Sequence, residues 1–152
     1  MIHYCKANLL DLFSIEHLEK TCFQGEAFCQ RLIKNLLTNP KSLVMKATLH
    51  PGSMVGNIIG IARKVNGKGV GRVFSLCVLE EHRKKGIAAG LIQRLEEEFF
   101  TNGIQKITLE VNVRNTAAQS FYQRHGYLTA PIVLPNFYRD GSDALVMSKT
   151  RG

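Results

Sequence analysis

Several features of membrane, secreted and metal-binding proteins are missing from this sequence. No apolar run approaches the ~18 residues that span a bilayer. The opening MIHYCKANLLDLF is interrupted by His, Lys, Asn and Asp, so it lacks the apolar core of a signal peptide. No cysteine pair has C-x-x-C spacing and the five histidines are scattered, so no metal-ligand pattern is present. We therefore expect a cytoplasmic protein without a metal site or membrane segment, with four buried, reduced thiols: Cys5, Cys22, Cys29 and Cys77.

Acidic residues are also few. The 12 Asp and Glu residues stand against 20 Lys and Arg residues, which gives a net charge of +8. Such a surface attracts polyanions, namely nucleic acid, ribosomes or phosphorylated small molecules, and charge alone does not choose between them. With 152 residues and 45% hydrophobic content the chain is long enough to bury a core, and no linker, repeat or low-complexity stretch divides it. We expect a single domain over residues 1–152.

Hydrophobic periodicity predicts an alternation of strands and helices. Alternating or continuous apolar runs predict strands at 2–7, 42–49, 57–65, 71–79, 106–111, 127–134 and 144–148. Helical spacing predicts helices at 9–23, at about 27–37, from Ile87 to a C-cap at Gly103, and at 116–125. Asn66-Gly67 predicts a tight hairpin turn. The order predicts a mixed α/β (α+β) fold, with a mostly antiparallel sheet, a central β-α-β crossover and helices on both faces.

The stretch EEHRKKGIAAGL, residues 81–92, joins a strand to a helix and combines basic side chains with small residues. A helix N-terminus presents unpaired N–H groups, and small residues let an anion approach them closely. This favours a phosphate or pyrophosphate site, although neither G-x-x-x-x-G-K-[ST] nor G-x-G-x-x-G is present. A solvated basic helix start is an equally good interpretation of the segment alone.

Three segments, in order, carry a family resemblance. RKKGIA, residues 83–88, has the form Q/R-x-x-G-x-G/A, and residues 109–127, LEVNVRNTAAQSFYQRHGY, have the form E-V-x-x-x-N-x-x-A-x-x-F/L-Y-x-x-x-G-F/Y. NFYRDGSDALVM, residues 136–147, is similar to Y-Y-x-D-G-x-D-A-x-x-M. Together they resemble the GNAT superfamily of N-acetyltransferases, and the last resembles its protein N-terminal acetyltransferases of the ribosomal-protein-alanine (RimI-like) type. The resemblance covers about residues 1–149 in element order and is sharp from about Val73 onward.

The resemblance implies a GNAT fold and acetyl-CoA as co-substrate. It assigns the CoA pyrophosphate to Arg83, Lys84, Lys85, Gly86, Ile87 and Ala88. It places the acetyl carbonyl near the main chain of Leu76, Cys77 and Val78, with the Val78 N–H as donor, while the Cys77 side chain is expected to be an inert core thiol. Asn115 would contact pantetheine or cap a helix, and the two roles are equally plausible.

The same resemblance names the catalytic pair. Glu110 would act as the general base toward the amine, directly or through water, and Tyr122 as the general acid toward the CoA sulfur, which it also contacts. Phe23, Glu110 and Tyr138 would line the acceptor site. The blander alternatives are an exposed strand carboxylate for Glu110, a core tyrosine for Tyr122 and an ordinary turn around Tyr138. The chain departs from the family in lacking tryptophan and in carrying Asn112 for a frequent arginine and Phe137 for a tyrosine.

Three hypotheses for function follow. The first is transfer of acetyl to a protein N-terminal α-amine by direct attack in a ternary complex, with a ribosomal protein as one candidate acceptor. The second keeps the fold and takes a small amine such as a polyamine or aminoglycoside, although like charges repel on a +8 surface. The third is a non-enzymatic RNA- or ribosome-associated module, which no nucleic-acid motif supports. No nucleic acid or membrane partner is required, and a monomer or weak homodimer is expected.

Overall fold

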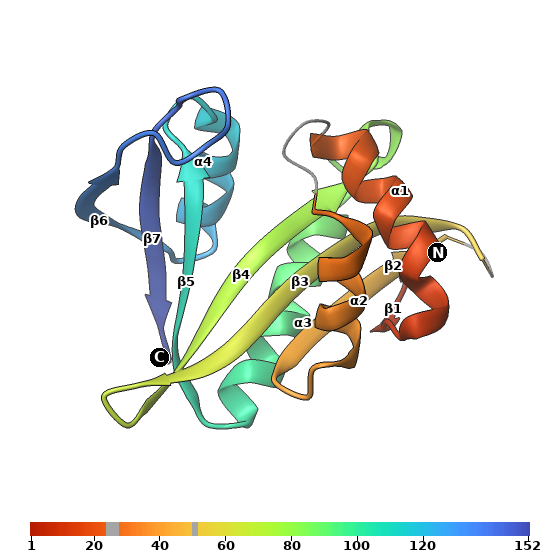
Figure 1. The fold of residues 1–152 in the computed structure, drawn as a ribbon, viewed down its shortest axis with the longest axis horizontal. Helices are drawn as coiled ribbons and strands as arrows, with labels where there is room; N and C mark the ends of the chain where they lie inside the picture. Colours follow the sequence, from red (N-terminus) through yellow and green to blue (C-terminus); the bar gives the residue numbers. More distant parts are fainter. Residues whose placement is uncertain (24–27, 50–51) are drawn as a thin grey trace.

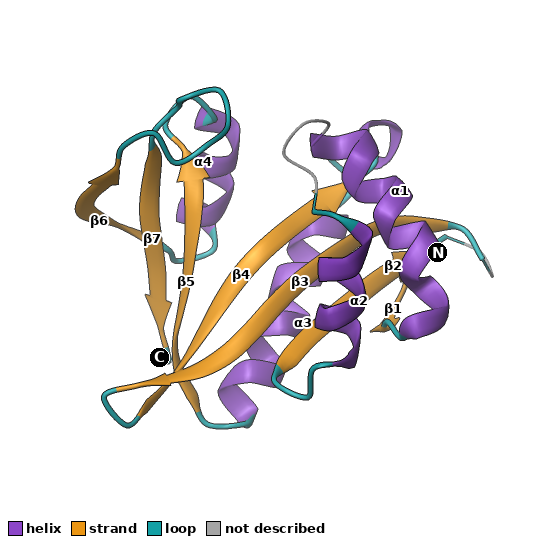
Figure 2. Ribbon diagram, viewed as in Figure 1, coloured by secondary structure: helices purple, strands orange, loops and turns teal. Residues whose placement is uncertain are grey.

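The computed structural model describes residues 1–23, 28–49 and 52–152 as one seven-stranded sheet with helices on both faces (Figures 1 and 2). The strand order is β1-β2-β3-β4-β5-β7-β6. The elements are β1 His3–Lys6, η1 Leu9–Asp11, α1 Leu12–Phe23, α2 Gln30–Thr38, β2 Ser42–Thr48, β3 Met54–Val65, β4 Lys68–Val78, η3 Glu80–His82, α3 Ile87–Thr101, β5 Ile104–Asn112, α4 Thr116–Arg124, β6 Leu128–Leu134 and β7 Ala144–Thr150. The expected fold class and element order are confirmed.

The sheet is antiparallel except at its centre, where β4 and β5 are parallel. These two strands pair only over residues 69–72 of β4, and beyond Arg72 they diverge (Figure 1). Two residues after Arg72, β4 carries a bulge, because Ile59 pairs with Ser75 while Gly60 pairs with Val73, which leaves Phe74 without an opposite residue. Residues 73–78 of β4 therefore have no partner strand on the side of β5, and we call this the free edge of β4.

Two hydrophobic clusters hold the helices onto the sheet. On one face α3 buries the expected stripe of Ile87, Leu91, Leu95 and Phe99. Phe99 packs closely against glycine in β4, since a Cβ built on Gly71 would lie 2.7 Å from its ring. On the other face α1 and α2 pack Ile15, Ile33 and Leu36 against Val44 and Ile59. The clusters fix α1 and α3 on opposite sides of β4.

Some local expectations differ from the structure. All four cysteines are free, but Cys5 and Cys29 are exposed and Cys22 is half-buried, so the expectation of four buried thiols holds only for Cys77. The first helix opens as a 3-10 turn capped by Asn8. The second begins at Gln30, and Ala27, its expected start, lies outside the described residues. Among the residues described, no helix has the length and apolar character needed to cross a membrane.

Candidate active site

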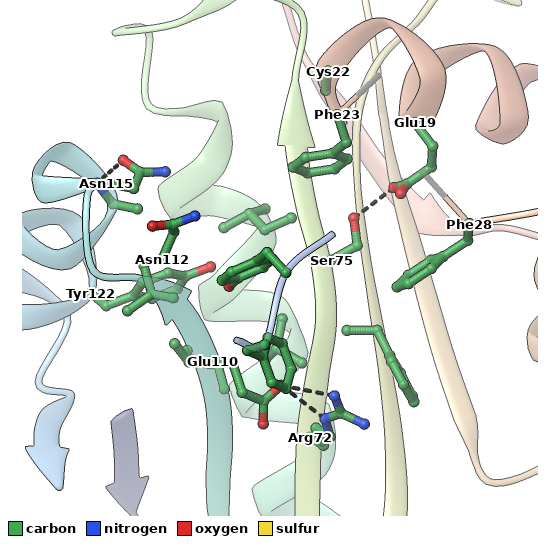
Figure 3. Close-up of a pocket in the computed structure, with 18 residues that line it drawn as sticks. Glu19, Cys22, Phe23, Phe28, Arg72, Ser75, Glu110, Asn112, Asn115 and Tyr122 are labelled. Atoms are coloured by element: carbon green, nitrogen blue, oxygen red, sulfur yellow. Dashed lines mark hydrogen bonds and ion pairs between the residues drawn. The ribbon is translucent and has the colours of Figure 1, made fainter. Parts of the chain in front are cut away.

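A cleft of about 510 Å³ opens where β4 and β5 diverge. Its walls come from α1, β4, β5, α4 and the loop between β6 and β7 (Figure 3). Six residues singled out in the sequence line it together: Phe23, Leu76, Glu110, Asn115, Tyr122 and Tyr138. Val78, Cys77 and the turn 83–88 do not line this cleft.

The free edge of β4 presents main-chain groups beside the cleft. The Leu79 N–H donates to the Val55 carbonyl at 2.9 Å, which fixes the phase of the β3–β4 ladder. Because bonded and non-bonded pairs alternate in an antiparallel ladder, the main chain of Ser75 and Cys77 faces β3, while that of Leu76 and Val78 faces the open edge. The Val78 N–H thus points to the open edge, whereas the Cys77 main chain is committed to β3, and the role of Val78 as oxyanion donor stays a prediction.

The basic turn enters α3 through left-handed backbone. Lys84 has φ 63° and Gly86, the N-cap of α3, has φ 80°, and no side chain caps the helix. Successive N–H groups in such a turn form a concavity that binds anions, and the helix dipole adds to it. Lys84 and Lys85 are exposed, whereas the Arg83 Nε donates to the Val78 carbonyl at 3.0 Å. This geometry suits an anion, and binding of the CoA pyrophosphate here stays a prediction. The bond from Arg83 also ties the turn to the end of β4.

Gly86→Ala is expected to weaken acetyl-CoA binding about tenfold, because a Cβ at φ 80° strains the backbone by roughly 1–2 kcal/mol and shifts the turn amides. Nothing lies within 4 Å of a Cβ there, so a clash is not the cause. Gly67→Ala is the matched control, with φ 77° and equally open space in the β3–β4 hairpin. Both variants should lose a similar amount of Tm, but calorimetric titration should show weaker acetyl-CoA binding for Gly86→Ala alone. Equal dissociation constants for the two variants would contradict the assignment.

Glu110 projects from β5 into the cleft and is held by an arginine of β4. Arg72 donates from Nη2 at 2.8 Å and from Nε at 3.1 Å to one carboxylate oxygen (Figure 3). Its guanidinium carbon lies 4.6 Å from the centre of the Phe74 ring. The second carboxylate oxygen makes no hydrogen bond among those found in the described residues, so Glu110 is oriented while keeping an oxygen for a ligand. The sequence interpretation missed Arg72, which pairs in register with Thr108, two residues before Glu110.

Tyr122 lies on α4, across the cleft from β4. It is buried, and its ring packs edge-on against Phe121 and Tyr127, with centroids 5.2 Å and 5.5 Å away. Burial, with a smaller effect of the neighbouring Tyr138, raises the pKa of Tyr122 well above its usual range. The phenol therefore keeps its proton at neutral pH, as a general acid must.

The remaining predicted residues fall at the rim and ends of the cleft. Asn115 caps α4, accepting the Ala118 N–H at 3.0 Å, and also lines the cleft, so its cap role is established and a pantetheine contact stays a prediction. Tyr138 and Phe137 pack edge-on, 5.0 Å apart, in the β6–β7 loop. Phe23 ends α1, and the rest of that expected acceptor segment, residues 24–27, lies outside the described residues.

Other polar side chains at the cleft carried no sequence signal. Glu19 of α1 is fully buried and accepts a 2.6 Å hydrogen bond from the Ser75 hydroxyl of β4. Both line the cleft.

In the part of the chain that the structure describes, no group of three or more His, Cys, Asp or Glu side chains could hold a metal ion.

Comparison with known proteins places this geometry in a family. A model of the acetyltransferase (GNAT) family matches residues 9–127. An uncharacterized N-acetyltransferase of Methanocaldococcus jannaschii is 33% identical over 142 residues, covering 93% of this chain and 86% of that protein. An N-alpha-acetyltransferase of Saccharolobus solfataricus is 30% identical, covering 90% of this chain and 75% of that protein.

The solved structures agree on the fold. The ribosomal-protein-S18-alanine N-acetyltransferase of Escherichia coli superposes with a TM-score of 0.84 at 22% identity, over 99% of this chain and 94% of that one. The sequence matches and their coverage lead to one conclusion. The chain belongs to the acetyltransferase (GNAT) family and is an N-acetyltransferase with acetyl-CoA as its co-substrate.

Proposed function

We propose that this enzyme transfers acetyl from acetyl-CoA to the N-terminal α-amine of a protein or peptide, by direct attack in a ternary complex. The observation that carries the proposal is a single cleft in which Glu110 and Tyr122 stand on walls flanking the free edge of β4. Family membership removes the non-enzymatic hypothesis. The relative from Saccharolobus solfataricus is an N-alpha-acetyltransferase, which supports the same acceptor class here.

Binding is shared between two main-chain surfaces. The amides of residues 84–88 suit the pyrophosphate, since their left-handed turn forms an anion-binding concavity at the start of α3. The free edge of β4 suits the pantetheine arm, because Leu76 and Val78 direct main-chain groups toward it. The Val78 N–H would then donate to the acetyl oxygen and stabilise negative charge that develops there.

The side chains move two protons. Glu110 takes a proton from the acceptor amine, directly or through a water, while the amine nitrogen forms its bond to the acetyl carbon. As the carbon–sulfur bond breaks, the electron pair leaves with sulfur and Tyr122 gives it a proton. Glu110 is already paired with Arg72. An α-amine with a pKa near ~8 loses its proton to such a carboxylate more easily than a lysine with a pKa near ~10.4 does. The pairing therefore favours an α-amine acceptor.

The acceptor class is tested by a panel of amines. Peptides with free N-termini are expected to show kcat/KM at least about tenfold above spermidine or an aminoglycoside, because the surface of +8 repels cationic small amines. The matched control is the same peptide with a blocked N-terminus and a free lysine. Mass spectrometry locates the added acetyl group. Faster acetylation of the small amines, or of the lysine, would replace this proposal with the second hypothesis.

A further inference from the structure

Glu19 is a buried carboxylate that the acetyl-transfer mechanism leaves unused. Its side chain is fully buried between α1 and the sheet. One oxygen accepts the Ser75 hydroxyl at 2.6 Å and lies 3.6 Å from the Cys77 sulfur. The other has no hydrogen-bond partner among the described residues. The ionisable groups around it are Cys22 on its own helix, Cys77 on β4 and, beyond Cys22, Arg83.

This arrangement lowers stability rather than raising it. Burial raises the pKa of Glu19, and the hydrogen bond from Ser75 partly opposes the shift. The folded state therefore holds the proton more tightly than the unfolded chain, whose value is near 4.5, and stability falls as pH rises from there through the raised pKa. A buried polar atom without a partner adds a further penalty. We therefore infer that the benefit of Glu19 lies in the residues that it holds.

Its contacts converge on the segment Ser75–Val78. Ser75 and Cys77 face α1 with their side chains, while Leu76 and Val78 turn their main chain to the open edge. β5 does not pair with β4 here, and the bulge at Phe74 loosens the strand just before it. The Val78 carbonyl is held by the Arg83 Nε at 3.0 Å and faces the Cys22 sulfur at 3.7 Å. α1 thus braces the half of β4 that has β3 on one side and no strand on the other.

We propose that Glu19 is a positioning residue, which anchors β4 through Ser75 and so fixes the Val78 N–H at the acetyl carbonyl. This rests on the proposed function for the donor role of Val78. The residue acts through the strand, because its bonds run to the Ser75 and Cys77 side chains on the α1 face of β4, whereas the Val78 N–H lies in the plane of the sheet at the open edge.

Three variants separate positioning from support of the fold. Glu19→Leu should lower kcat about tenfold or more at a temperature well below its Tm, since a 1 Å displacement at a reacting centre can lose about 100-fold. The KM for acetyl-CoA should stay within about twofold. Glu19→Gln keeps an oxygen that accepts from Ser75 and should restore kcat to within about threefold. Ser75→Ala is the smaller perturbation and should lower kcat in the same direction if Glu19→Leu does not fold.

A readout without acceptor distinguishes failure of this inference from failure of the proposed function. Adding acetyl-CoA to 15N-labelled enzyme should shift the Val78 and Ala88 amide resonances. In Glu19→Leu the Val78 shift should shrink while the Ala88 shift persists. Unchanged kcat together with an unchanged Val78 shift would overturn the positioning role, as would a loss of kcat that merely follows a loss of Tm. If wild-type enzyme acetylates no peptide, the proposed acceptor is wrong, and the Val78 shift still decides the role of Glu19.

Discussion

Tyr122→Phe is expected to lower kcat about 100-fold while leaving the dissociation constant for acetyl-CoA within about twofold, because general acid catalysis contributes ~10²–10⁴. The substitution removes one oxygen and keeps the ring that packs against Phe121 and Tyr127. Since burial raises the pKa of Tyr122, the phenol carries its proton at neutral pH. Steady-state kinetics and calorimetric titration measure the two effects separately.

Tyr127→Phe is the matched control for this loss. Tyr127 is also buried and sits 5.5 Å from Tyr122, ring centre to ring centre, but it lies outside the residues that line the cleft. The control should retain the wild-type kcat. An undiminished kcat in Tyr122→Phe would make Tyr122 a core tyrosine, which is the blander reading of the sequence.

Glu110→Gln should lower kcat/KM about 100-fold at pH 7, and this defect should shrink toward pH 9. An α-amine with a pKa near ~8 is largely neutral at pH 9 and no longer needs a base. The amide preserves the shape of the side chain but leaves Arg72 without its anion at 2.8 Å. A pH–rate profile of both enzymes from pH 6.5 to 9.5 measures the difference.

The Arg72 ion pair offers a competing explanation, in which Glu110 only holds β4 to β5. A defect of equal size at every pH would support that structural role and remove Glu110 as the base. Glu97→Gln is the control, because Glu97 is an exposed glutamate on α3 away from the cleft, and its kinetics should match the wild type.

The predictable parts of the fold are those that depend on residues close together in the sequence. The α3 stripe of Ile87, Leu91, Leu95 and Phe99 and the Asn66-Gly67 turn each depend on neighbours in sequence, and both are confirmed. Four of the six cleft-lining residues, Glu110, Asn115, Tyr122 and Tyr138, were found by motif, since motif spacing carries positions along the chain. Phe23 and Leu76 were found from the order of elements in the family. Their roles are the subject of the predictions above.

The contacts that could not be predicted from the sequence depend on the register between strands that are distant in the chain. Arg72 and Glu110 are 38 residues apart, and Ser75 and Glu19 are 56 apart. Only the parallel pairing of Arg72 with Thr108 and the crossing of α1 over β4 bring these groups together. Glu19 sits among polar residues in EHLEKT, where a surface position is the natural expectation. The exposure of Cys5 and Cys29 likewise reflects strand-edge and helix-start positions that composition does not encode.

The free edge of β4 also makes the folded state depend on metabolite supply. Under the proposed function, acetyl-CoA lies along main-chain groups that only the splayed sheet presents, so it binds the folded protein and not the unfolded chain. A ligand at 100 times its dissociation constant adds about 2.7 kcal/mol to the free energy of unfolding. The same unpaired edge that admits the substrate would then tie the lifetime of the enzyme to the acetyl-CoA concentration around it.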